Sequence, residues 1–182
     1  MPSATSEATV PRVAVTEPSA PASNAELIRW AFDVLNTHDV TPLKALWSDE
    51  TWERFPTRTA RGADDIASMF DAAFAALPDF VVRIVELAEQ GDNVFVRWKV
   101  TGTHTGAPWE GVAPSGKRVE LDGIDHFVVR DGRVVSNFIV FDQLQFAQAV
   151  GLMPQTGTLG DRAVKAAFAL RTRAAQALRA RS

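Results

Sequence analysis

Hydrophobic residues recur at helical spacing in the first half of the chain. Ser23-Asn24-Ala25-Glu26 has the form of a capping box, in which the serine side chain accepts a backbone N–H and the glutamate reaches back. Apolar positions then follow every three or four residues as far as Leu35. The pattern predicts a helix from Ser23, a short second helix starting at Thr41-Pro42, and a third over residues 63–77, which Pro78 ends.

The second half changes to strand-like segments rich in Val, Ile and Phe. These segments cover residues 80–87, 93–103, 118–129 and 134–141, and residues 51–56 could add a short strand. Asp131-Gly132 between the last two segments is a strong hairpin signal. Helices followed by consecutive antiparallel strands predict an α+β domain, with helices covering one face of a curved sheet.

The two ends of the chain differ from the middle. Residues 1–22 are rich in proline and have no hydrophobic period, so we expect a disordered N-terminal tail. The folded domain is predicted over residues 23–154, with a short helical turn at 144–150 near its end. Residues 155–182 are predicted to form a basic helical tail, because six basic residues and one acidic residue follow position 160 among many alanines. This tail could be a solvated helix packed on the domain or a partner subunit, or it could bind an anionic surface or a partner protein.

Composition narrows the classes of function. The chain has 182 residues, enough for one domain, and a formal net charge of -3, which does not favour nucleic-acid binding. It has no cysteine, which excludes disulfides, thiolate metal sites and cysteine nucleophiles. The chain has neither a signal-like start nor an apolar run long enough to cross a bilayer, so we expect a cytoplasmic protein without a membrane span.

Asp142 is the first candidate for a catalytic residue. It follows the very apolar segment 134–141, and alternation puts it on the same side as Phe138 and Val140. A carboxyl group in an apolar cavity has a raised pKa and can act as a general acid or base. The alternative is that Asp142 caps the helical turn that follows it.

Asp125 and His126 are further catalytic candidates on the preceding strand. Alternation places Asp122, Ile124 and His126 on one side of this strand, and Gly123, Asp125 and Phe127 on the other. Asp125 or His126 can therefore face a pocket, but not both. His126 could orient or protonate an enolate oxygen, or it could be an ordinary structural histidine.

Aromatic residues are spread over helices, strands and the long loop, as a pocket wall of flat groups requires. We expect the substrate pocket to be lined by Trp30, Trp52, Phe55, Trp98, His104, Trp109 and Phe138. His104 and Trp109 lie in the loop at 103–116, which could form a gate. The sequence has no phosphate-binding glycine loop, serine elbow or zinc helix, so we expect neither a metal nor a cofactor.

Several short motifs in a fixed order resemble the SnoaL-like polyketide cyclase family over residues 24–154. They include Asn36-Thr37-His38-Asp39, Leu77-Pro78-Asp79-Phe80, Gly91-Asp92-Asn93-Val94-Phe95-Val96-Arg97-Trp98, Gly102-Thr103-His104-Thr105-Gly106, Pro114-Ser115-Gly116-Lys117, Gly123-Ile124-Asp125, Asp131-Gly132-Arg133-Val134 and Phe141-Asp142. The resemblance implies a cone-shaped α+β barrel of the nuclear-transport-factor type, which pairs as a homodimer through the outer face of its sheet.

The resemblance also implies a chemistry. Family members of known activity close a ring on a polyketide ester by an intramolecular aldol reaction, with an aspartate as acid and base and without metal or cofactor. By resemblance that aspartate is Asp142, and His126 is similar to a pocket histidine. The sequence departs from the family at Phe138, where many members have tryptophan, and at Ala149-Val150, where Gln-Leu is common, so the pocket is reshaped. Because the same cone hosts many activities, a non-catalytic module for small-molecule binding or assembly is the alternative function.

Overall fold

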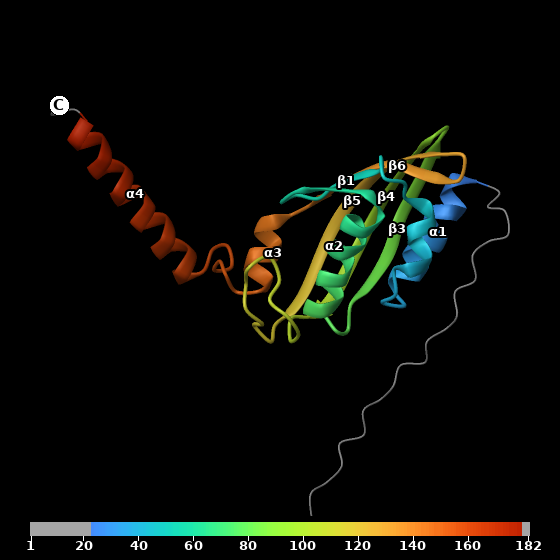
Figure 1. Ribbon diagram of the computed structural model, residues 1–182. Helices are drawn as coiled ribbons and strands as arrows, with labels where there is room; N and C mark the ends of the chain where they lie inside the picture. The colour runs from blue at the N-terminus through green and yellow to red at the C-terminus, as the bar shows by residue number, and fades with distance from the viewer. Residues whose placement is uncertain (1–22, 180–182) are drawn as a thin grey trace, which may run out of the picture.

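Six strands form one curved sheet, which is the framework of the structure (Figure 1). The computed structural model describes residues 23–179, so the tail predicted over residues 1–22 lies outside the described residues. The strands are β1 (Trp52–Arg54), β2 (Thr59–Arg61), β3 (Val81–Gln90), β4 (Asn93–Thr103), β5 (Arg118–Arg130) and β6 (Arg133–Phe141). The other elements are α1 (Asn24–Leu35), the 3₁₀ helix η1 (Thr41–Leu46), α2 (Gly62–Ala76), α3 (Gln143–Ala149) and α4 (Leu159–Arg179).

The sheet has the order β2-β1-β6-β5-β4-β3. All neighbouring strands are antiparallel except β1 and β6, which run parallel. The α+β class agrees with the prediction from sequence. The sheet is curved but is not closed into a barrel, because β2 and β3 are edge strands that do not pair with each other.

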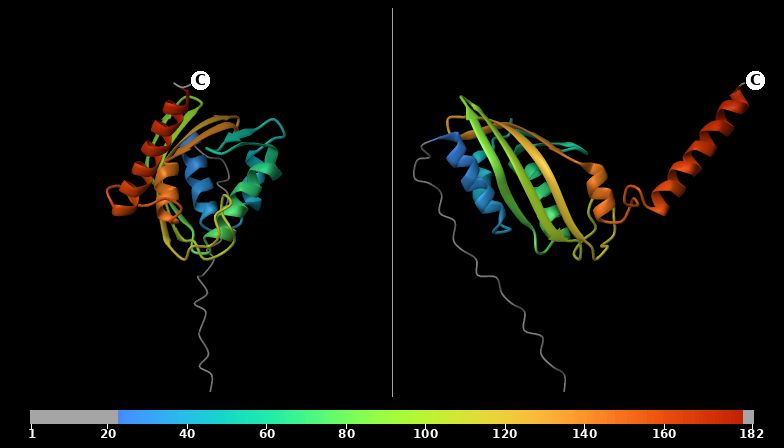
Figure 2. Two further views of the ribbon diagram at one scale, coloured as in Figure 1. Left: turned by 90° about the vertical axis from the view of Figure 1, so that its left-hand side faces the viewer. Right: turned by 180° about the vertical axis from the view of Figure 1, so that it is seen from behind.

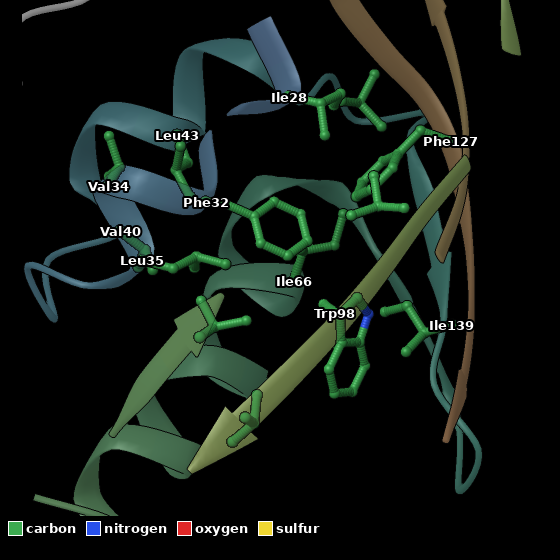
Figure 3. Close-up of a cluster of buried hydrophobic side chains, with 14 of the residues drawn as sticks. Ile28, Phe32, Val34, Leu35, Val40, Leu43, Ile66, Trp98, Phe127 and Ile139 are labelled. Atoms are coloured by element: carbon green, nitrogen blue, oxygen red, sulfur yellow. The ribbon is translucent and has the colours of Figure 1, made fainter. Parts of the chain in front are cut away.

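Helices α1 and α2 cover one face of the sheet (Figure 1). Ser23 caps α1, because its hydroxyl accepts the Glu26 backbone N–H at 3.2 Å. The apolar face of α1 is buried against the sheet, where the ring of Phe32 meets the edge of Phe127 on β5 with centroids 6.5 Å apart. Figure 3 shows this contact beside Trp98 of β4 and Ile139 of β6. The core therefore lies between the helices and the concave side of the sheet.

A side chain at the end of α1 fixes the angle at which this helix crosses the sheet. The Asn36 amide donates to the Val82 carbonyl at 2.9 Å, and its oxygen accepts the Val82 backbone N–H at 2.8 Å. This pair of hydrogen bonds replaces ladder bonds that the edge strand β3 would otherwise leave to water. The helix is thus held to the sheet at its last turn.

Helix α4 projects away from the rest of the structure (Figure 2). It follows α3 through residues 150–158, where Gly151 and Gly157 adopt positive φ angles. Among residues 23–179, no helix is long and apolar enough to cross a membrane.

Gly123 on β5 lies directly opposite Trp98 on β4, and a methyl group there would sit 2.2 Å from the indole ring. We expect Gly123→Ala to lower the free energy of unfolding by about 1–3 kcal/mol, because the well-packed indole must move. Urea denaturation measures this change. The control is Val81→Thr on the edge strand β3, which is 43% exposed and should change stability by less than about 0.5 kcal/mol. Equal stability of both variants would contradict the tight contact.

Candidate functional site

A cavity of about 140 Å³ lies between the helices and the concave face of the sheet. Its wall is mostly aliphatic and aromatic, and its polar lining residues are Glu53, Asp125, Asn137, Thr57 and Glu110. An apolar pocket with a few converging polar groups is the usual form of a small-molecule site.

Glu53 and Asp125 are the two acidic groups in the closed part of this cavity. Their residues are 2% and 6% exposed. The Trp47 indole donates to Glu53 Oε1 at 3.0 Å, and the Trp98 indole donates to Asp125 Oδ1 at 2.9 Å. No salt bridge among the described residues includes either carboxyl group, and no Lys, Arg or His lines the cavity.

Asn137 connects these two acids. Its amide nitrogen donates to Glu53 Oε2 at 3.3 Å. A hydrogen bond from the same side chain to Asp125 lowers the pKa of that acid. Asn137 is 1% exposed, and its Oδ1 has no hydrogen-bond partner. A buried acceptor without a partner is uncommon and indicates a group that a ligand or a proton can satisfy.

Strand register brings the three polar side chains together. In the parallel pair of β1 and β6, Glu53 lies beside Asn137. In the antiparallel pair of β5 and β6, Asn137 lies opposite Phe127, two residues from Asp125. Side chains two residues apart on a strand share one face, so Asp125, Phe127 and Asn137 all face the cavity. The site therefore depends on a contact between β1 and β6, which are far apart in sequence.

Burial without a cation raises the pKa of both acids. Burial is the main cause for Glu53, whose pKa rises to about 8, and the nearby Asp125 adds to this rise. Burial also raises the pKa of Asp125 to about 7, against the hydrogen bonds from Trp98 and Asn137. The pair therefore retains a proton near neutral pH, and Glu53 holds it more firmly than Asp125.

Asp142 does not point into the cavity, which corrects the prediction from sequence. It is exposed and caps α3, because its Oδ1 accepts the backbone N–H groups of Leu144 and Gln145 at 2.8 and 3.0 Å. The predicted alternation was right, since Asp142 follows the exposed side chains Phe138 and Val140. The side of β6 that carries Phe138, Val140 and Asp142 is the outer face of the sheet, so the predicted pocket position of Asp142 is wrong.

His126 lies on the outer face of the sheet, and Asp125 is the member of that pair that faces the cavity. The His126 Nε2 atom is 2.9 Å from Asn93 Oδ1, and its ring stacks on Phe95 with centroids 4.3 Å apart. These contacts hold His126 on the surface, away from the acid pair.

The predicted pocket residues divide into two groups. Phe55, Trp98 and Trp109 line the cavity, whereas Trp30, Trp52, His104 and Phe138 do not. Trp30 is buried elsewhere in the core and Trp52 is half-buried. Phe138 is on the outer face under the Arg54 guanidinium, 5.1 Å from its ring centroid.

His104 is fully buried but serves the loop between β4 and β5. Its backbone N–H donates to the Lys117 carbonyl and its carbonyl accepts from Gly116, and its ring is 3.3 Å from the Ala107 carbonyl. This loop carries Trp109, which packs edge-on against Phe146 of α3 with centroids 4.8 Å apart. His104 thus supports the cavity wall indirectly.

Two exposed residues mark the open end of the cavity. Thr57, in the turn between β1 and β2, donates its hydroxyl to Glu110 Oε1 at 3.3 Å. Glu110 belongs to the β4–β5 loop and has a positive φ of 49°. One weak hydrogen bond therefore joins the two segments that border the opening.

Glu53 and Asn137 were not predicted, although each leaves a trace in the sequence. Asn137 is the only amide within the apolar segment of β6, and Glu53 lies between Trp52 and Phe55. A polar side chain inside an apolar strand is costly unless it has partners. A polar residue in an apolar segment can therefore be identified as a buried polar group. The pattern does not show that Glu53 and Asn137 lie next to each other.

Among residues 23–179, no group of three His, Asp or Glu residues is placed to hold a metal ion. The groups that the described residues supply at the site are the two carboxyls, two indole N–H donors and one amide.

A helix-covered, open sheet with an apolar cavity and buried acids defines a small-molecule pocket protein of the cone type. The family model of SnoaL-like polyketide cyclases matches residues 25–150, so the chain belongs to the SnoaL-like polyketide cyclase family. No curated protein matches the sequence.

Solved structures share this fold. AclR of Streptomyces galilaeus, a candidate hydroxylase, is 22% identical with a TM-score of 0.67, and the match covers 85% of this chain and 98% of AclR. A candidate SnoaL-like polyketide cyclase from a Jannaschia species is 22% identical with a TM-score of 0.65, covering 76% and 100%. IdmH of Streptomyces antibioticus, a candidate polyketide cyclase, is 21% identical with a TM-score of 0.59, covering 69% and 96%. At these identities the likeness concerns the fold alone.

The acid pair makes stability depend on pH. The folded pKa values of about 8 and about 7 lie above the ordinary values of 4.5 and 3.8, so the folded chain binds more protons than the unfolded chain between these limits. The free energy of unfolding should therefore fall as pH rises from about 5 to about 9. Urea denaturation at several pH values measures this slope.

The double variant Glu53→Gln, Asp125→Asn is the control, because it removes both titrating groups at nearly constant shape. It should lose most of the decline over this pH range even if its overall stability is lower. An equal decline in this variant would mean that other groups cause it.

Proposed function

We propose that the protein is a cofactor-independent enzyme for carbon-acid chemistry on a neutral, polyketide-like carbonyl compound, with Asp125 as the acid and base. The observation that carries this proposal is the acid pair buried in an apolar cavity without a cation. Membership of the SnoaL-like family supports the reaction type, an intramolecular aldol cyclisation.

Asp125 is the better base of the two acids. Its pKa of about 7 leaves a useful fraction ionised at neutral pH, and a base with a pKa near the working pH is the most effective. Asp125 takes the proton from a carbon between two carbonyl groups. The resulting enolate carbon attacks a second carbonyl of the same molecule to form the C–C bond, and Asp125 returns its proton to the new alkoxide oxygen.

Glu53 acts on this base through Asn137, as a positioning residue. The Asn137 amide nitrogen lies 3.3 Å from Glu53 Oε2. The same side chain hydrogen-bonds Asp125, so Asn137 links the neutral acid to the base and gives Asp125 a donor besides Trp98. This arrangement keeps one acid neutral and the other ionised, the usual basis for separate roles of paired carboxyls.

The charge of the cavity restricts the substrate. A free carboxylate would enter an apolar space that already holds two acidic groups and offers no cation, so its desolvation would be uncompensated. An ester of the same compound carries no charge and avoids this cost. The cavity therefore favours an ester over the corresponding acid.

Exchange of an activated C–H with solvent tests the base without knowledge of the natural substrate. The probe is an aryl β-keto methyl ester in D₂O, followed by proton NMR and corrected for the spontaneous rate. Asp125→Asn should slow the catalysed exchange at least ~100-fold, the scale for loss of a positioned acid and base. The wild-type rate should rise with pH up to about 7, where Asp125 becomes ionised.

Asp142→Asn is the matched control, since it makes the same chemical change outside the cavity. It should retain exchange within a few-fold. A large loss in this variant with normal rates in Asp125→Asn would overturn the assignment to Asp125. Ester binding by the wild type without any catalysed exchange would instead favour the non-catalytic binding module.

A homodimer is a further part of this proposal. Phe95, Ile124, Phe138 and Val140 are 39–51% exposed on the outer face, and cross-strand pairing with His126 makes them one patch over β4, β5 and β6. An exposed apolar patch on one sheet face is typical of a protein interface. Pairing through this face is what the family resemblance implies.

Light scattering after size-exclusion chromatography measures the subunit number. We expect the wild type to be a dimer, and Val140→Lys in the patch to shift it toward the monomer by placing a buried charge at the interface. Val81→Lys, on the edge strand β3, is the control and should leave the dimer intact. A monomeric wild type would contradict this proposal.

A further inference from the structure

Helix α4 leaves large apolar side chains in solvent. Phe168 and Leu170 are 70% and 72% exposed, and Val164 is 47% exposed. The helix projects from the domain in Figure 1 and in the right view of Figure 2. It also lies beyond residues 25–150, which the family model matches.

These side chains belong to a two-sided helix. At 100° per residue, Ala163, Val164, Ala167, Phe168 and Leu170 fall on one broad side. Arg162, Lys165, Thr172, Arg173 and Gln176 fall on the other. Arg171 lies within the apolar side, where its long stem can lie along apolar groups while its charge reaches water.

The charge of α4 is opposite to that of the rest of the chain. It holds Arg162, Lys165, Arg171, Arg173 and Arg179 against the single acid Asp161, whereas the whole chain has a net charge of -3. Asp161 is already bonded to Lys165 at 2.8 Å and accepts the Gly157 backbone N–H. The ion pair leaves the helix strongly cationic.

Two apolar surfaces of a second copy of the chain could cover α4, and neither supplies the anionic groups that its cations require. A second α4 would bring two cationic helices together, which is repulsive. Beside the apolar patch on the outer sheet face, the acids Glu86 and Glu120 are already paired with Arg97 and Lys99, so this face offers α4 little anionic charge. Nucleic acid would use the cations but would leave the apolar side uncovered. A surface that is anionic outside and apolar beneath satisfies both sides of α4.

We propose that α4 binds the surface of an anionic lipid bilayer, lying in the interface with its apolar side buried and its cations at the headgroups. The buried side chains are Ala163, Val164, Ala167, Phe168 and Leu170. A helix with a wide apolar side, a basic polar side and low overall hydrophobicity has the features of an interfacial helix, not of a spanning one. Residues 150–158 join α4 to α3 and the rest of the domain.

Co-sedimentation of the full chain with vesicles tests this proposal. Vesicles of phosphatidylcholine mixed equally with phosphatidylglycerol should bind at least ~10-fold more tightly than vesicles of phosphatidylcholine alone, and salt should weaken the binding. The variant with Val164→Gln and Phe168→Gln should lose at least ~10-fold in binding without a change in charge. Thr172→Gln, on the polar side, is the control and should bind as the wild type does.

Three results would overturn the proposal. The first is no binding to anionic vesicles, and the second is equal binding to both kinds of vesicle. The third is an unchanged affinity in the double variant. If light scattering without lipid also shows that this variant loses subunits relative to the wild type, α4 is a contact between copies of the chain instead.

Discussion

The site depends on the burial of two carboxyl groups in a cavity that no basic side chain of the described residues lines. Each acid keeps only neutral donors, an indole N–H and a shared amide, so the charged form of each is poorly stabilised. The surrounding helices exclude water, and the strands hold both acids at one place. This arrangement costs free energy, and the proton that it retains near neutral pH is the basis of the proposed chemistry.

Much of the fold could be predicted from sequence, because local rules determine its elements. Ser23 caps the first helix as expected, and the Asp131-Gly132 turn joins the last two strands. The parallel pairing of β1 with β6 was not predictable, since a strand of three residues has almost no hydrophobic pattern of its own. The same missing contact explains why Glu53 was overlooked.

The candidate site was harder to predict than the fold. Both sides of β6 are apolar, with Phe138 and Val140 on one side and Ile139 and Phe141 on the other, so hydrophobicity could not tell which side faces the core. On β5 the two sides differ, since Asp125 accompanies Gly123 and Phe127. Alternation shows that only one of Asp125 and His126 can face the pocket, but it does not say which one. The packing of α1 against the sheet places Asp125 on the cavity side.

The pairing of β1 with β6 joins residues 84 positions apart in the contact between Glu53 and Asn137. Such distant contacts form late, because a long loop must close before they contribute. Closing that long loop costs conformational entropy that the short β3–β6 turns do not incur, so the pairing of β1 with β6 is the least local contact on which the site depends. A change that weakens this pairing would separate Glu53 from Asn137 while leaving the hairpins of the sheet in place.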